Sequence, residues 1–144
     1  MHAIHTTPGF IIDSRPYGEA GKMISIFTRD FGLVSAVAQG IRLEKSKLRY
    51  FAQDYSLGIF SLVRGKELWR LTSAQESALA VEGKVALEIL ARVSLLLRRL
   101  LQGEEPQPEL FDLVESLAAF LKGNAALSAE EMRALESLSV FRIL

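Results

Sequence analysis

Seven basic residues in the first half of the chain carry its clearest chemical signal. Between Arg42 and Arg49, four cations fall within eight residues and are opposed only by Glu44. Such cations bind phosphates by releasing counterions, which supplies much of the affinity for nucleic acid. Composition alone favours the alternative, a charged surface that faces water, whereas the clustering favours a phosphate-binding track. The predicted contacts are Arg15, Arg42, Lys45, Lys47, Arg49, Arg64 and Lys66.

Four aromatic residues lie among these cations and raise the possibility of base stacking. They are Tyr17, Tyr50, Phe51 and Trp69. A stacked base is worth about 1–3 kcal/mol in single-strand binding. Tyr17 lies in a turn beside Gly18 and is the predicted stacking residue, although a turn tyrosine can also cap an apolar edge. Phe51 and Trp69 are expected in the core.

The sequence carries no recognisable catalytic constellation. It has no cysteine, and it contains no phosphate-binding loop, catalytic triad or paired-carboxylate spacing. His2 and His5 are three residues apart but have no third ligand nearby, so we predict no metal site and no cofactor. The prediction is therefore a binding protein and not an enzyme.

The second half of the chain differs in charge from the first. Residues 1–70 hold ten Lys/Arg against six Asp/Glu, whereas residues 71–144 hold seven against eleven. This asymmetry indicates two parts with different partners. Three arginines in the acidic half are candidates for binding an acidic peptide, and the alternative is a solvated polar stripe on a helix. They are Arg92, Arg98 and Arg99.

The local pattern predicts a barrel that positions the cations. Runs of β-forming residues at 10–15, 23–28 and 33–38 are separated by short Gly-bearing turns, which is typical of an antiparallel meander. A short helix is expected over 46–53, followed by strands at 55–63 and 68–72. This order predicts a five-stranded OB-fold over residues 1–76, with the helix closing one end.

From about Lys84 the apolar period becomes helical. A helix over 84–101 has a narrow polar stripe, which predicts burial on most sides. A second helix follows from Pro108 to about Lys122, and Ser128 with Glu131 forms a capping-box pattern that predicts a third. The apolar end at residues 140–144 predicts that this helical domain, residues 77–144, is incomplete or packs on a partner. No apolar run is long enough for a membrane span.

Several segments resemble a known family. Ser14–Glu19 (SRPYGE), Ile26–Arg29 with Gly32, Ala36–Arg42 (AVAQGIR) and Lys45–Leu48 look like the RecO family of bacterial recombination mediators. Leu71–Glu76, Pro108–Leu113 and Ser139–Leu144 are similar to later parts of that family. Arg15, Arg42, Lys45 and Lys47 lie within these motifs, whereas Arg49, Arg64 and Lys66 are predicted from charge and position.

The resemblance implies an OB-fold followed by a helical domain in a bacterial cytoplasmic protein associated with the nucleoid. It implies binding of single- and double-stranded DNA and annealing of complementary strands. It also implies recombinase loading with RecR and docking on the acidic tail of single-strand binding protein. Members of the family commonly continue through more helices and often carry a cysteine zinc motif, which this sequence lacks. An alternative function is a protein-interaction module whose helical part binds an acidic peptide tail.

Overall fold

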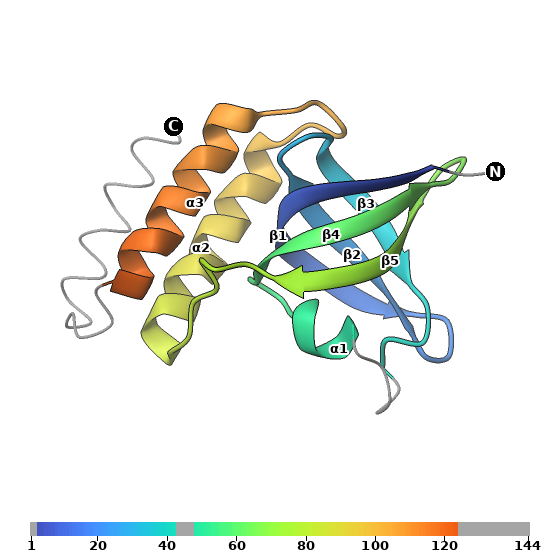
Figure 1. Cartoon of the computed structure of the whole chain (residues 1–144), viewed down its shortest axis with the longest axis horizontal. Helices are drawn as coiled ribbons and strands as arrows, with labels where there is room; N and C mark the ends of the chain where they lie inside the picture. The colour runs from blue at the N-terminus through green and yellow to red at the C-terminus, as the bar shows by residue number, and fades with distance from the viewer. Residues whose placement is uncertain (1–2, 43–47, 124–144) are drawn as a thin grey trace.

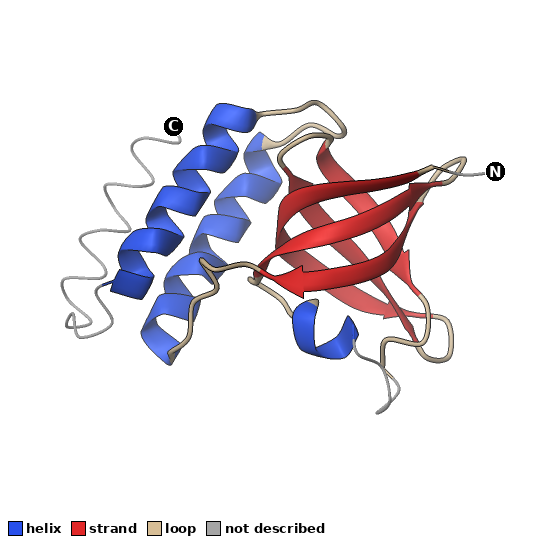
Figure 2. Cartoon of the chain, in the orientation of Figure 1, coloured by secondary structure: helices blue, strands red, loops and turns tan. Residues whose placement is uncertain are grey.

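A closed β-barrel and two long helices make up the computed structural model, which describes residues 3–42 and 48–123. The strands are β1 (Ile4–Tyr17), β2 (Gly21–Thr28), β3 (Gly32–Ala38), β4 (Leu57–Arg64) and β5 (Trp69–Glu76). The helices are α1 (Leu48–Phe51), α2 (Lys84–Leu100) and α3 (Pro108–Gly123). Figure 2 shows the helices α2 and α3 on one side of the barrel and α1 at one end of it.

The strand order β1-β2-β3-β5-β4 closes the barrel. All neighbouring strands are antiparallel except β3 and β5, which pair in parallel through Ala36 with Trp69 and Val37 with Arg70. The strand β1 pairs with β4 along its first half and with β2 along its second half, with an irregularity between Ile11 and Asp13. A bulge of this kind bends a strand and lets one strand serve both neighbours. The predicted OB-type barrel followed by helices is therefore confirmed.

The inward-facing side chains fill the barrel. This core combines β-branched residues of β2 and β3 with Phe60 and Leu62 of β4 and with Trp69 and Leu71 of β5. The helix α1 contributes little length, but Ala52, which follows it, is 3% exposed and Leu48 packs against the same core. As the sequence predicted, this short helical turn closes one end of the barrel.

A second core lies on the outside of the barrel. Phe10, Ile12, Phe27 and Leu57 face outwards and are buried under α2 and α3. The ring of Phe27 meets Phe111 of α3 edge-to-face, with the centroids 5.5 Å apart. Figure 1 shows α2 lying between α3 and the barrel. Barrel and helices therefore share one continuous apolar layer.

The loop between α2 and α3 is fixed against the barrel. The amide of Leu33 donates to the carbonyl oxygen of Gly103 at 3.0 Å, close to the tight turn between β2 and β3. In that turn Gly32 has a φ of 70°, and a side chain there would collide with the backbone of Glu105. Glycine is required here both for the left-handed backbone and for the close approach of the loop.

We expect the substitution Gly32→Ala to lower the free energy of unfolding by about 1–3 kcal/mol, because it combines backbone strain with this collision. Urea denaturation followed by circular dichroism measures the change. The control is Gly103→Ala, which adds a methyl group at a similar positive φ of 64° but with no atom within 4 Å of it. Equal losses in the two variants would show that the loop does not press on Gly32.

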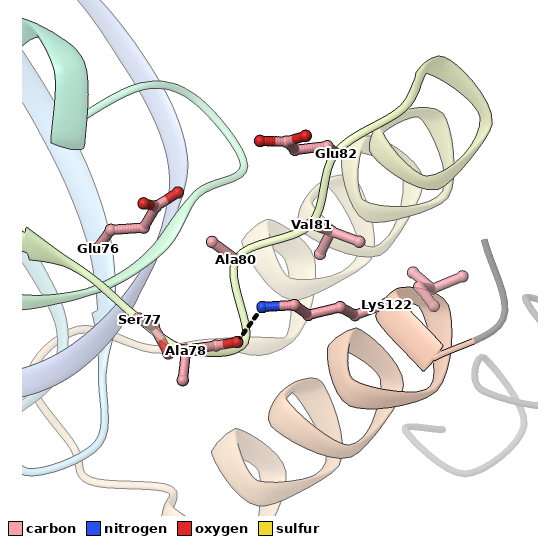
Figure 3. Close-up of a pocket in the computed structure, with 8 residues that line it drawn as sticks. Glu76, Ser77, Ala78, Ala80, Val81, Glu82 and Lys122 are labelled. Atoms are coloured by element: carbon pink, nitrogen blue, oxygen red, sulfur yellow. Dashed lines mark hydrogen bonds between the residues drawn. The ribbon is translucent and has the colours of Figure 1, made fainter.

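The connection between β5 and α2 is held by the end of α3. Lys122 donates a hydrogen bond to the carbonyl oxygen of Ala78 (Figure 3). A pocket of about 750 Å³ lies between this connection and α3, and Glu76 and Glu82 are among its lining residues. Figure 3 shows both glutamates on the same stretch of chain as Ala78 and Ala80. Among the described residues, the lining of this pocket carries two carboxylates against the single ammonium group of Lys122, so the pocket suits a phosphate poorly.

Several boundaries differ from those predicted. The strand β1 begins at Ile4 and not near Phe10, and β5 extends to Glu76 and not to Thr72. Within the described residues, the predicted helix over 46–53 is the single turn Leu48–Phe51. The predicted third helix from Ser128 lies outside the described residues. Within the described part of the chain, no helix is long and apolar enough to cross a membrane.

The prediction that the first long helix is buried on most sides is wrong. The leucines Leu87, Leu95 and Leu100 of α2 are 37%, 57% and 38% exposed. The helix buries one face only, formed by residues such as Ile89, Leu90, Val93 and Leu97. A high content of leucine does not by itself say how many neighbours a helix has.

Candidate nucleic-acid interface

Three cations from different elements meet at the end of the barrel closed by α1. Lys22 begins β2, Arg42 follows β3, and Arg49 lies on α1, and all three line one pocket of about 410 Å³. The other lining residues are Ile41, Ala52 and Gln53, so no carboxylate lines it among the described residues. We call this the basic pocket. Its lining suits an anion.

The fold positions each of these cations. Lys22 pairs with Ala38, whose side chain belongs to the barrel core, so Lys22 extends from the inner face of β2 at the end of the barrel that α1 closes. Nη2 of Arg42 donates to the carbonyl oxygens of Gly18 at 2.8 Å and Glu19 at 2.7 Å. Both acceptors are neutral carbonyl groups, so these hydrogen bonds hold Arg42 in place without offsetting its positive charge.

A second basic feature crosses the outer face of the barrel. The strand register places Arg15 beside Met23, Met23 beside Val37, and Val37 beside Arg70. Three strand spacings separate the two arginines by roughly 14 Å. Both are exposed, and Tyr17, 46% exposed, follows Arg15 on the same face of β1. We call this set the outer row. Its basic and aromatic residues lie on β1 and β5, and the row crosses strands 2 and 3 between them, the face that OB-folds commonly use for oligonucleotides.

The remaining predicted cations lie at the opposite end of the barrel. Arg64 ends β4 beside the start of β1, and Lys66 is exposed in the turn that follows. The guanidinium of Arg64 stacks 4.7 Å from the ring centroid of Trp69 and forms a 2.8 Å ion pair with Glu104. Arg64 thus fastens the α2–α3 loop to the barrel, and Glu104 offsets much of its charge. The structure does not bring Arg64 and Lys66 together with the basic pocket.

The aromatic residues divide between core and surface. Trp69 is 3% exposed, as predicted, and its indole N–H donates to Glu104 at 3.1 Å. The ring of His5 packs edge-to-face on Phe31 and Trp69. The expectation that Phe51 lies in the core is wrong, because it is 38% exposed and packs beside Tyr50, which is 81% exposed. A single helical turn buries only one side, and here that side is formed by Leu48 and Ala52.

The three arginines of α2 do not converge. Arg98 turns towards the barrel, where it forms a 3.7 Å ion pair with Asp13 of β1. Arg92 and Arg99, both exposed, are seven residues apart and so lie on one stripe of the helix, with the exposed Leu95 between them. We call Arg92, Leu95 and Arg99 the α2 stripe.

Sequence reasoning missed two residues of the candidate interface, Lys22 and Arg70. In the predicted strand over 68–72, Arg70 follows the core residue Trp69 and so faces the opposite side, which is a signal that could have revealed its exposure. The position of Lys22 depends on the strand register, which has no local signal in the sequence. The predicted contacts Lys45 and Lys47 lie outside the described residues.

The parallel β3–β5 pair, the closed five-stranded order and the helical turn at the barrel end define an OB-fold with a basic pocket at one end. The family described as "Recombination protein O N terminal" matches residues 1–78. This chain therefore belongs to the RecO family.

Curated relatives agree with this assignment. The DNA repair protein RecO of Alkalilimnicola ehrlichii is 33% identical over 132 residues, which cover 91% of this chain and 53% of the relative. That of Desulfitobacterium hafniense strain DCB-2 is 33% identical over 117 residues, covering 78% and 42%. That of Haemophilus influenzae strain Rd is 29% identical over 104 residues, covering 72% and 44%. The chain spans about half the length of these relatives.

Proposed function

We propose that this protein acts in DNA repair by binding DNA strands along the basic pocket and the outer row and by promoting the annealing of complementary strands. The observation that carries the proposal is the convergence of Lys22, Arg42 and Arg49 on one pocket with no acidic lining residue among those described. Membership of the RecO family and the names of the relatives, each a DNA repair protein, support it.

The two basic features suit different parts of a strand. The cations bind the phosphates, because charge-assisted hydrogen bonds to phosphate are short and strong. Bases lie against exposed Tyr17, which provides a stacking surface beside Arg15. Because phosphate contacts carry no base information, binding is weakly dependent on sequence. Neutralising the two backbones lowers the repulsion between complementary strands, which is the physical basis of annealing.

Binding and annealing of labelled oligonucleotides test the proposal. The protein should bind unrelated single-stranded sequences with similar affinities at about 50 mM salt. It should also accelerate the pairing of two complementary strands, followed by fluorescence quenching. Absence of binding to every oligonucleotide at low salt would contradict the proposal, whatever the annealing rate.

The α2 stripe favours a second function, the docking of an acidic peptide tail such as that of single-strand binding protein. Leu95, 57% exposed, offers an apolar contact between two arginines that would pair with carboxylates. Arg98 lies off this stripe and turns towards the barrel, where it pairs with Asp13. A role for RecR as a partner stays a prediction from the resemblance.

We expect the double variant Arg92→Glu with Arg99→Glu to lower the affinity for a fluorescent acidic peptide by about tenfold or more, because it places carboxylates against carboxylates. Fluorescence anisotropy measures the change, and oligonucleotide binding by the same variant serves as the internal control. Lys84→Glu, at the start of the same helix, is a control for a single charge reversal outside the α2 stripe. If the double variant binds the peptide as tightly as the parent, the α2 stripe is not the docking site.

A further inference from the structure

The shape of the basic pocket indicates a more specific ligand than the middle of a DNA strand. We propose that it binds the phosphorylated terminal nucleotide of a DNA strand. This inference rests on the proposed DNA binding and adds to it the part of the strand that the pocket receives.

The charge of the pocket exceeds what an internal phosphate needs. An internal phosphodiester carries a single negative charge, whereas a terminal phosphate monoester carries about −1.5 to −2 near pH 7. Lys22, Arg42 and Arg49 line one space, and no carboxylate is among the described residues that line it with them. Arg42 is held by two backbone carbonyls at 2.7 and 2.8 Å, so little side-chain freedom remains to be lost when an anion binds. Three cations around one site match a dianion better than a monoanion.

The floor of the pocket closes it on the barrel side. Ile41 and Ala52 are 2% and 3% exposed, and both belong to the packed interior of the barrel. The DNA chain leaves an internal nucleotide in two directions, which an extended groove permits. It leaves a terminal nucleotide in only one direction, so a pocket closed from below can hold that nucleotide.

The size of the pocket exceeds that of a phosphate alone. Its volume of about 410 Å³ falls within the range of small-molecule sites, roughly 300–1,000 Å³. Gln53 also lines it, and its amide nitrogen already lies 3.5 Å from the carbonyl oxygen of Arg49. The amide oxygen of Gln53 is then a hydrogen-bond acceptor for the sugar or base that accompanies the phosphate.

Oligonucleotides that differ only in their ends test this inference. Three labelled forms of one single-stranded sequence are compared: a linear strand with a terminal phosphate, the same strand with hydroxyl ends, and a closed circle. The terminal phosphate should strengthen binding by roughly tenfold over the other two forms, the effect of one added charge-assisted contact. Both ends are tested, since either a 5′- or a 3′-phosphate carries the required charge.

Two variants assign the preference to the pocket. Lys22→Gln removes the charge but keeps a polar side chain only one atom shorter, and should abolish the preference for a terminal phosphate. Lys66→Gln removes the same charge at the opposite end of the barrel and should leave the preference intact. Circular dichroism and thermal unfolding should show both variants folded like the parent.

Each other result overturns the inference in a recognisable way. Equal binding of all three forms would leave DNA binding intact and reject a site for strand ends. If the preference for a terminal phosphate survives Lys22→Gln, the strand end binds outside the basic pocket. If deoxyadenosine monophosphate competes at concentrations as low as the phosphorylated oligonucleotide, the pocket is a site for free nucleotides and not for strand ends. Absence of any DNA binding would reject the proposed function itself.

Discussion

Replacing Trp69 by alanine is expected to lower the free energy of unfolding by about 3–5 kcal/mol, the usual cost of removing a large buried aromatic side chain. Trp69 is 3% exposed and belongs to the core of the barrel. It also contacts three groups outside that core: its ring meets His5 and the guanidinium of Arg64, and its N–H meets Glu104. The substitution therefore weakens both the barrel and the contact with the α2–α3 loop. Urea denaturation followed by far-ultraviolet circular dichroism measures the loss.

The variant Trp69→Phe separates these two contributions. It keeps an aromatic ring in the core but removes the hydrogen bond to Glu104, which should cost about 1 kcal/mol beyond any change in packing. A Trp69→Ala protein as stable as the parent would mean that the fifth strand does not close the barrel as described.

Reversing two charges of the basic pocket should have the largest effect on binding. The double variant Lys22→Glu with Arg49→Glu replaces two attractive phosphate contacts by two repulsive ones. We expect the affinity for single-stranded DNA at about 50 mM salt to fall by a hundredfold or more, about 2.7 kcal/mol. Arg42 is left in place, because its contacts with Gly18 and Glu19 also hold the barrel end together. Fluorescence anisotropy with a labelled oligonucleotide measures the loss.

The matched control makes the same change of charge on α2. Arg92→Glu with Arg99→Glu changes the net charge by the same amount, but away from the barrel end. Its loss of DNA affinity should be smaller than that of the pocket variant by a factor of about ten or more. Thermal unfolding should be similar for both variants, since the replaced side chains are at least partly exposed. Equal losses of affinity would indicate a response to net charge and no defined site.

The barrel was predictable from the sequence because its turns and its alternation are local. Glycine-bearing turns and runs of β-forming residues located all five strands. The start of β1 was missed because Pro8 usually argues against a strand. In the structure the carbonyl oxygen of Pro8 accepts from the amide of Arg29, at the place where β2 has just ended. The nitrogen of Pro8 faces the same side, where β2 provides no ladder partner, so proline is tolerated.

The candidate site was only partly predictable. The cluster around Arg42 was visible because its residues are neighbours in the sequence. Lys22 joins it through the pairing of β2 with β3, and Arg70 joins the outer row through the parallel β3–β5 pair. Arg64 was predicted as a DNA contact, but its ion pair with Glu104 joins residues 40 positions apart. Such long-range partners cannot be read from local spacing.

The salt dependence of single-stranded DNA binding tests the central claim, that phosphates of DNA bind at the basic pocket, most directly. The logarithm of the association constant is measured against the logarithm of salt concentration for the parent and for Lys22→Gln with Arg49→Gln. Each lost phosphate contact should reduce the slope by about 0.7, so the double variant should be shallower than the parent by about 1.4. Lys84→Gln should leave the slope unchanged. A double variant with the slope of the parent would contradict the claim and make the basic pocket a solvated surface.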